Sequence, residues 1–274
     1  MILLVASSQD KASINITKQI LQHYSFKKTD TVFQGNPEYS AEVNGKEVVF
    51  VTLRAEAINA QDLPESFANL DLVIFISRHS SASGIPTLSV HTPGNLADAA
   101  LGGLPRVVSI SPANSMRDAL KFLAELQEEM NLDYEVSYEC THHGPSLNVP
   151  AMFVELGSSE KQWNDSKAAE AVAHATMEAI AKFAPSKRSA VLGIGGPHYN
   201  RQFTRMAIHS ETIFGHMIPK YAIKLIDTEI LRQCVEKTLE KVEYAVLDWK
   251  GIRSEDKSKL QAALQDIGLR YEKT

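Results

Sequence analysis

Short apolar runs alternate with longer amphipathic segments along most of the chain. Continuous apolar or β-branched runs predict strands, and apolar residues that recur every three or four positions predict helices. The predicted strands cover residues 1–6, 47–53, 71–77, 107–110, 134–140, 151–156, 190–194 and 244–247. The predicted helices cover residues 11–24, 115–130, 165–183, 228–241 and 254–267. Asp10 or Ser8 is the expected cap of the first helix.

The order of these elements predicts an α/β fold. Strands that alternate with helices form a mixed, mostly parallel sheet with helices on both faces. The runs 47–53 and 71–77 are apolar throughout, as expected of strands that are covered on both faces. No internal repeat, low-complexity tract or long linker interrupts the pattern, so we expect a single domain that spans residues 1–274.

Charge and cysteine content narrow the class of protein. The formal net charge of −5 argues against a broad basic face that coats nucleic acid, although a local basic rim remains compatible with it. The two cysteines, Cys140 and Cys234, form no disulfide framework, which favours a reducing compartment. The apolar run at residues 1–6 is too short for a signal peptide, and no stretch is long enough for a membrane span. We therefore expect a cytoplasmic protein that binds neither membrane nor DNA.

Seven of the nine histidines lie beside turn residues or hydroxyls in predicted loops. The segments are Ser77–Ser81, His91–Asn95, Thr141–Pro145, Gly195–Tyr199 and Phe214–His216, with His209 before the last. Imidazole titrates near neutral pH and is the commonest transition-metal ligand. His79, His142 and His198 follow three different predicted strands, and open α/β sheets bind ligands at the carboxyl ends of their strands. We therefore expect one pocket with hydrolytic or metal chemistry.

The segment Thr141–Pro145 and the later Glu155 are candidates for metal ligands. Neighbouring histidines on extended backbone point to opposite sides, so one of His142 and His143 is expected to serve a given metal. Glu155 ends an apolar run, where a carboxylate is costly unless it is paired, metal-bound or exposed. Zinc hydrolases use three such ligands and leave a position for water. The alternative interpretation, a turn histidine and a glutamate that faces water, stays open.

The remaining segments carry weaker signals. Arg78 is suited to bidentate binding of phosphate or carboxylate, although a serine-rich surface loop without chemical importance is the alternative there. Gly195 and Gly196 let the backbone approach a ligand close to His198. They form neither a P-loop nor a dinucleotide-binding fingerprint. A nucleophilic mechanism is disfavoured, because buried cysteines such as Cys140 are mostly structural and no Gly-x-Ser-x-Gly motif occurs.

These motifs, in this order, resemble the archaeal and plant type of D-aminoacyl-tRNA deacylase. The similarity rests on Ser8–Ser13, Ser77–His79, His91–Asn95, Thr141–Pro145, Glu155–Ser159 with Trp163, Gly195–Tyr199 and Gly215–His216. It spans nearly the whole chain. It implies a phosphorylase/hydrolase-like fold and a zinc-dependent monomer that hydrolyses the ester between a D-amino acid and the tRNA 3′ end.

The resemblance does not itself assign roles, so the following assignments are hypotheses. The leading ligands for one or two zinc ions are His142, Glu155 and His198. Further ligands, proton carriers or oxyanion donors are His79, His91, His143, His216, Gly195 and Gly196. Substrate-binding candidates are Arg78, Ser80, Asn95 and Tyr199. Local basic residues that could meet the phosphates of the tRNA 3′ end are Lys161, Arg201, Arg205 and Lys220, so we expect binding to weaken with salt.

Two other functions are compatible with the sequence. One is a zinc amidohydrolase or exopeptidase that acts on a small acylated molecule and needs no tRNA. The other is a noncatalytic nucleotide- or RNA-binding module, which predicts little metal uptake and no turnover. Five histidine-bearing segments weigh against the second, because binding modules rarely gather so many titratable groups in one cleft.

Overall fold

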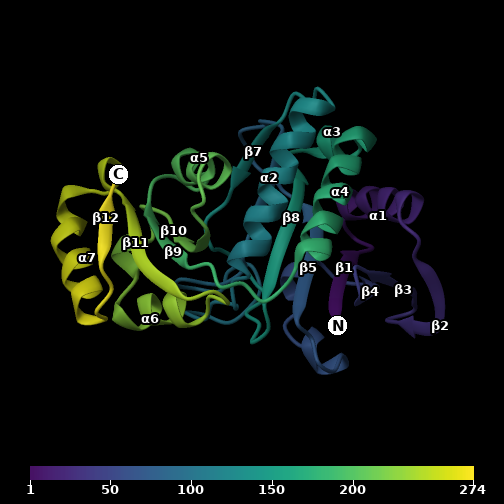
Figure 1. The fold of residues 1–274 in the computed structure, drawn as a ribbon, viewed down its shortest axis with the longest axis horizontal. Helices are drawn as coiled ribbons and strands as arrows, with labels where there is room; N and C mark the ends of the chain where they lie inside the picture. Colours follow the sequence, from purple (N-terminus) through teal and green to yellow (C-terminus); the bar gives the residue numbers. More distant parts are fainter.

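The computed structural model describes all residues from 1 to 274, and their strands form two sheets that lie side by side (Figure 1). The large sheet has the order β2-β3-β4-β1-β5-β8-β6-β7 and the small sheet the order β10-β9-β11-β12. The strands of the large sheet are β1 (Ile2–Ser7), β2 (Lys27–Phe33), β3 (Asn36–Val43), β4 (Lys46–Leu53), β5 (Leu72–Arg78), β6 (Thr87–His91), β7 (Glu135–Tyr138) and β8 (Ala151–Gly157). Those of the small sheet are β9 (Ala190–Gly195), β10 (Phe214–Ile218), β11 (Val242–Asp248) and β12 (Tyr271–Lys273).

The predicted α/β class and the mostly parallel pairing are confirmed. Antiparallel pairs occur between β2 and β3, between β3 and β4, and between β6 and β8, and the other neighbours run parallel. The division into two sheets was not expected from the alternation of elements. One apolar cluster nevertheless joins both sheets, since Phe214 and Val246 of the small sheet belong to the same core as Ile74 of the large one. This shared core supports the single-domain interpretation.

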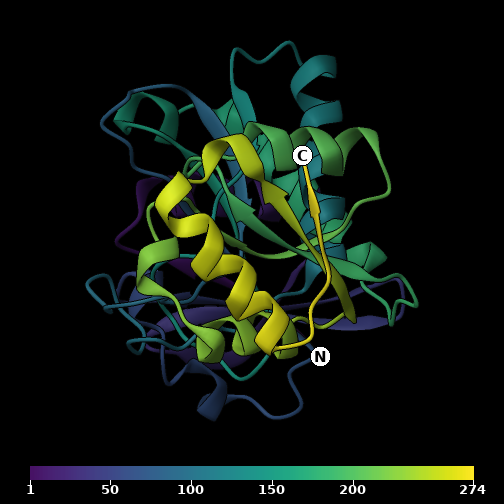
Figure 2. The ribbon, with the colours of Figure 1, turned by 90° about the vertical axis from the view of Figure 1, so that its left-hand side faces the viewer.

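Helices cover one face of the large sheet and both faces of the small one. The helices are α1 (Lys11–His23), α2 (Ala113–Glu129), α3 (Glu160–Trp163), α4 (Ser166–Lys182), α5 (Arg201–His209), α6 (Thr228–Glu236) and α7 (Ser254–Asp266). Apolar residues of α1, α2 and α4 pack on the large sheet and also meet Phe203 of α5. On the opposite side of the small sheet, Ile230 of α6 and Leu260 of α7 pack against Leu192. Figure 2 shows α7 outermost on that side.

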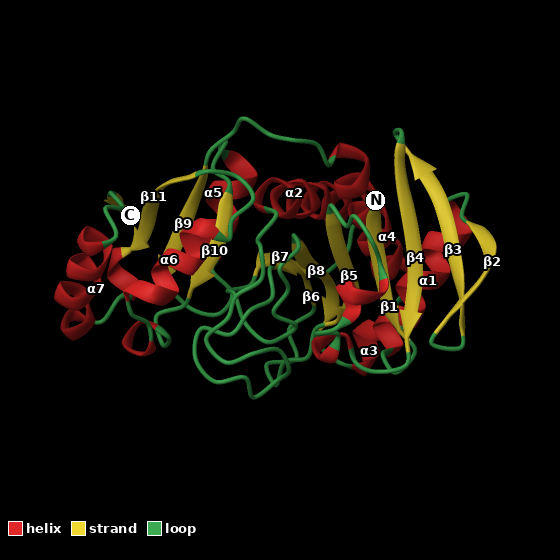
Figure 3. Cartoon of the chain, turned by 90° about the horizontal axis from the view of Figure 1, so that it is seen from below, coloured by secondary structure: helices red, strands yellow, loops and turns green.

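The second face of the large sheet is covered by loops. Alternate residues of a strand point to opposite faces, and Val5 and Phe75 join a cluster separate from the helical core. This cluster is completed by Ala57 and Leu63, from two 3-10 turns, and by Leu147, from a loop. Figure 3 shows loops gathered beneath the middle of the molecule, where β6, β7 and β8 lie. Loops that cover a sheet face, unlike packed helices, can supply polar groups to a site.

Most predicted elements exist within a few residues of their expected bounds, and one prediction is wrong. The run 107–110 is no strand, because Val108 and Ile110 form only isolated bridges with the loop residues Gly94 and Pro150. The structure adds elements that the sequence did not predict, namely β2, β3, β6, β10, β12, α3 and α5. None of the helices is long and apolar enough to cross a membrane.

Asp10 caps α1, as predicted, and also reaches β5. Its carboxylate accepts hydrogen bonds from the backbone N–H of Ser13 at 3.0 Å and of Arg78 at 2.7 Å. Burial raises the pKa of Asp10 to about 6, although both backbone hydrogen bonds act to lower it. Because the unfolded chain loses this proton near its ordinary pKa of 3.8, the folded state holds the proton over a higher pH range.

We expect this burial to make stability fall as the pH rises. The contribution of Asp10 is complete below about pH 3.8 and is lost as the pH passes through the folded-state pKa of about 6. Wild type should therefore lose roughly 2 kcal/mol more than Asp10→Asn between pH 4 and pH 7, measured by urea unfolding. Asp133→Asn, at an exposed position, should keep the wild-type slope. Parallel stability curves for wild type and Asp10→Asn would contradict the assignment.

Candidate active site

The site is built on the loop-covered face of the large sheet. Glu155 of β8 lies opposite Ser77 of β5 and Ser89 of β6, and two residues earlier Phe153 lies opposite His91. Because these residues occupy alternate positions, their side chains share one face of the sheet. The Ser77 hydroxyl donates to Oε1 of Glu155 at 2.6 Å, and the Glu155 side chain is almost fully buried. Ser77, Ser89 and Glu155 thus form a row of polar side chains inside the protein.

Three histidines gather beside this row. His91, His142 and His143 each offer a ring nitrogen that lies within 4.8 Å of the other two. In each ring, Nδ1 donates to a backbone carbonyl. The accepting oxygens belong to Thr92 at 3.3 Å, Cys140 at 2.8 Å and Gly144 at 2.7 Å. A proton on Nδ1 leaves the Nε2 lone pair free, which is the form that binds metals.

Burial keeps two of these rings neutral. It lowers the pKa of His143 to about 4 and that of His142 well below its usual value, and the neighbouring imidazoles act in the same direction. Nε2 of His91 is buried without a hydrogen-bond partner, and the nearest carboxylate oxygen, on Glu155, is 3.7 Å away. Three nitrogen donors with an unsatisfied buried atom among them fit a zinc ion.

Glu139 organises a second group of side chains. This residue is fully buried just after β7. Its Oε2 accepts from Nε2 of His198 at 2.8 Å and lies 3.6 Å from Nε2 of His142, while its Oε1 is 3.2 Å from Nδ1 of His79. Burial alone would raise the pKa of Glu139, but the hydrogen bond from His198 and the positive charge of the adjacent His79 hold it well below the usual range. Glu139 is therefore a carboxylate held between imidazoles.

His79 and His198 carry the matching positive charge. Burial lowers the pKa of both rings, but this is outweighed by Glu139 and Glu155 at His79, and by Cys140 and Glu139 at His198. The pKa of each imidazole is raised to about 10. The site thus separates neutral histidines, suited to metal binding, from protonated histidines paired with carboxylates.

The position of His79 depends on its neighbours in the fold. The Tyr199 hydroxyl lies 2.5 Å from Nε2 of His79, and the indole of Trp163 donates to the His79 carbonyl at 2.9 Å. A Cβ atom at Gly157 would lie only 2.6 Å from that of His79. Glycine at position 157 therefore leaves the space that the imidazole fills.

A cavity of about 380 Å³ opens onto most of these groups, whereas His91 and Glu139 are fully buried and do not line it. Its polar lining comes from Ser77, Arg78, His79, Ser80, His142, His143, Glu155, His198 and Tyr199, and its remaining walls from Glu56, Ala57, Ile58, Leu101 and Phe153. Most of the predicted site residues are thus brought together around one space. Arg78, however, forms an ion pair with Glu56 at 2.9 Å, so its guanidinium is already engaged.

His216 and Asn95, both predicted site residues, lie elsewhere. His216 is fully buried, with Nδ1 3.1 Å from the Thr141 hydroxyl and Nε2 3.0 Å from the Lys237 carbonyl, so both ring nitrogens are engaged. Burial lowers its pKa to about 4. The Asn95 amide donates to two carbonyls of its own loop, those of Gly102 and Leu104.

The predicted glycine pair also lies away from the histidines. Gly195, the last residue of β9, and Gly196, which follows it, adopt positive φ values of 108° and 70°. A Cβ atom there would meet Asp248 or Asn200 instead of a histidine. Both glycines therefore shape a tight turn, and they do not line the histidine cavity.

The sequence does not single out Glu139, and it predicts a structural role for Cys140. Sγ of Cys140 lies 3.1 Å from Nδ1 of His198, so the thiol and an imidazole do meet. Cys140 is buried and does not line the cavity, which supports the structural role given to it above. One signal could have identified Glu139: it is the last polar position in the alternating run 134–140, immediately before the histidine motif.

Comparisons with known proteins agree with the resemblance seen in the sequence. The family model of D-aminoacyl-tRNA deacylase matches residues 66–272. A D-aminoacyl-tRNA deacylase from Thermococcus onnurineus is 33% identical over 98% of both chains, and one from Pyrococcus abyssi is 34% identical over the same shares. The crystal structure of a conserved protein of unknown function, AF0625, has a TM-score of 0.88 and 30% identity, and the match covers 100% of this chain and 95% of that chain. The expected likeness to phosphorylases and hydrolases at large stays a prediction. The chain belongs to the D-aminoacyl-tRNA deacylase family.

Proposed function

We propose that this protein hydrolyses the ester between a D-amino acid and the 3′ end of tRNA, and so releases free tRNA and the D-amino acid. Family membership supports the reaction class. The observation that carries the proposal is the single cavity in which neutral and protonated imidazoles meet. Ester hydrolysis needs both an activated water and a proton for the departing ribose oxygen.

We propose that one zinc ion is held by His91, His142 and His143. This revises the ligand set expected from the sequence, because Nε2 of His198 already donates to Glu139. When bound, zinc lowers the pKa of a water molecule towards about 7 and polarises the ester carbonyl. His79, Glu139 and Glu155 also lie within 4.8 Å of one another, but the protonated His79 and His198 together compensate the two carboxylates, so we assign this group to proton transfer and not to a second ion.

The protein's own groups supply the remaining chemistry. Glu139 and Glu155 hold His79 in its protonated form, and His79 contacts the Tyr199 hydroxyl in the cavity wall. This pair can pass a proton to the ribose oxygen as its bond to the acyl carbon breaks. The amino-acid side chain then lies against the apolar wall of Ile58 and Leu101.

A direct assay separates this function from its alternatives. We expect purified protein to deacylate D-aminoacyl-tRNA at least a hundredfold faster than the matched L-aminoacyl-tRNA, and a chelator to abolish the reaction until zinc is restored. Faster turnover of small esters or amides than of aminoacyl-tRNA would favour an amidohydrolase or exopeptidase. Absence of any turnover would favour a binding module. We further propose that the protein acts as a cytoplasmic monomer that contacts mainly the tRNA 3′ end.

A further inference from the structure

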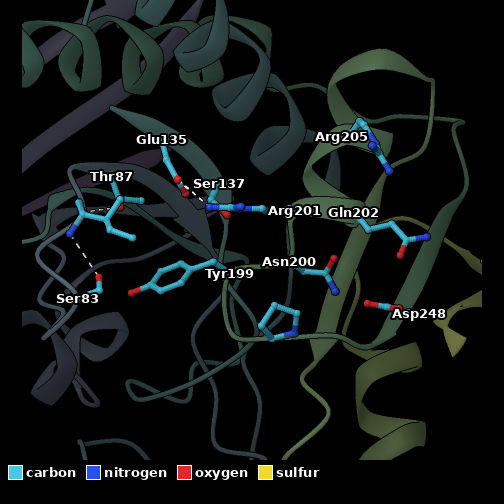
Figure 4. Close-up of a pocket in the computed structure, with 12 residues that line it drawn as sticks. Ser83, Thr87, Glu135, Ser137, Tyr199, Asn200, Arg201, Gln202, Arg205 and Asp248 are labelled. Carbon is cyan, nitrogen blue, oxygen red and sulfur yellow. Dashed lines mark hydrogen bonds and ion pairs between the residues drawn. The ribbon is translucent and has the colours of Figure 1, made fainter. Parts of the chain in front are cut away.

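A second cavity, of about 580 Å³, adjoins the histidine cavity (Figure 4). Its walls come from three parts of the fold: the loop and strands around β6 and β7, the beginning of α5, and the end of β11. The residues are Ser83, Ile85, Thr87, Glu135, Ser137, Pro197, Tyr199, Asn200, Arg201, Gln202, Arg205 and Asp248. Only two of these are hydrophobic, so the cavity suits a polar ligand.

Tyr199 lines both cavities and separates them. Its backbone pairs with that of Glu139, and its hydroxyl lies 2.5 Å from Nε2 of His79. A substrate whose reacting ester lies among the histidines would therefore extend past Tyr199 into the second cavity. Figure 4 shows the phenol ring projecting into this space, where it offers a flat aromatic surface.

The positive charge in this cavity comes from α5. Asn200 caps the helix, and Arg201 and Arg205 follow in its first turns. Arg201 forms an ion pair with Glu135 at 2.7 Å, whereas Arg205 is exposed and forms no ion pair. Arg205, in the second turn of α5, therefore offers an exposed guanidinium that can bind a phosphate.

The other lining groups suit an unpaired nucleobase. Glutamine and carboxylate side chains, here Gln202 and Asp248, accept hydrogen bonds from the exocyclic amino groups of adenine and cytosine. Aromatic rings such as that of Tyr199 stack on bases that are free of a helix. A site that binds a phosphate, stacks on a base and accepts hydrogen bonds from amino groups makes the contacts by which proteins bind single-stranded RNA.

We infer that this second cavity binds the terminal nucleotides of the tRNA acceptor strand, with Arg205 on a phosphate and Tyr199 between the nucleotide and the ester. The inference rests on the proposed function, because that function places the ester in the adjoining cavity. It makes the second cavity the part of the enzyme that distinguishes aminoacyl-tRNA from a small ester of the same amino acid.

The test compares Arg201→Gln/Arg205→Gln with Arg232→Gln, a matched change on the exposed side of α6. For the double variant we expect KM for D-aminoacyl-tRNA to rise about tenfold with little change in kcat. The preference for aminoacyl-tRNA over the methyl ester of the same D-amino acid should fall by a similar factor. The logarithmic slope of binding against salt should become shallower by about 0.7 for each phosphate that the variant no longer neutralises. Arg205→Lys should recover part of the affinity.

A binding measurement makes the inference independent of turnover. Fluorescence anisotropy should show that wild type binds a minihelix with an intact acceptor end more tightly than one without its terminal nucleotides, and that the double variant loses this difference. Equal binding of the two RNAs by wild type would overturn the inference, as would identical behaviour of the double variant and Arg232→Gln. If wild type binds the intact end selectively but fails to deacylate it, the proposed function is wrong and the binding site stands.

Discussion

Replacing His142 by asparagine should lower kcat/KM for D-aminoacyl-tRNA by a hundredfold to a thousandfold and remove most of the bound zinc. The asparagine amide can still donate to the Cys140 carbonyl, as Nδ1 of His142 does at 2.8 Å. It has no atom at the position of Nε2, where the ring is free to bind metal. The change therefore removes one ligand and keeps the local backbone contact.

Zinc content and steady-state kinetics measured on the same preparation check this expectation. His209→Asn is the matched control, because His209 is exposed at the end of α5 and away from both cavities. It should keep wild-type zinc and activity. If His142→Asn retained a full equivalent of zinc and activity within twofold of wild type, the proposed ligand set of three histidines would be refuted.

The sequence predicted the fold where apolar burial dominates. Strands β1, β4, β5 and β8 are buried on both faces, so their continuous apolar runs were unmistakable. The hairpin of β2 and β3 was missed because its residues are polar and partly exposed at the sheet edge. Strand β10 was missed because Gly215 and His216 interrupt its apolar pattern. Pairing with neighbouring strands, and not local preference, makes these segments extended.

The sequence predicts where the candidate site lies better than it predicts the role of each residue. Loop membership predicted that His79, His142, His143 and His198 would meet, and they do. It could not predict the direction of each ring, which depends on backbone carbonyls and neighbouring strands. His216 is consequently buried away from the cavity in strand β10, where the sequence predicts a loop.

Glu139 is a site residue that the sequence does not reveal, because its role also depends on contacts with distant segments. The local pattern marks Glu139 as a polar position before the histidine motif, but it does not show that the side chain is buried. Its surroundings arise from the bridge to Tyr199 and from the chain that returns with His198, about sixty positions later in the sequence. The Glu139 carboxylate becomes a positioning group only because two distant segments, those of His79 and of His198 with Tyr199, pack around it.

Replacing Glu139 by glutamine should therefore have the largest effect of any single change outside the zinc ligands. The variant keeps the size of the side chain but leaves the protonated His79 and His198 facing a neutral amide. Removing one partner of a buried ion pair costs about 3–5 kcal/mol of unfolding free energy. We also expect kcat to fall by a hundredfold or more with little change in KM, because the imidazoles that transfer protons lose their orientation while the contacts to tRNA remain.

The loss of stability and the loss of kcat can be measured separately if the kinetics are recorded at a temperature where the variant is folded. Kinetics should be measured where circular dichroism shows Glu139→Gln to be fully folded, and compared with Glu236→Gln, an exposed change on α6. A purely structural role would leave kcat of the folded variant at the wild-type level, even though its melting temperature falls. A reduced kcat at unchanged KM in the folded variant would instead show that Glu139 positions His79 and His198 for the reaction, since Glu139 itself does not line the cavity.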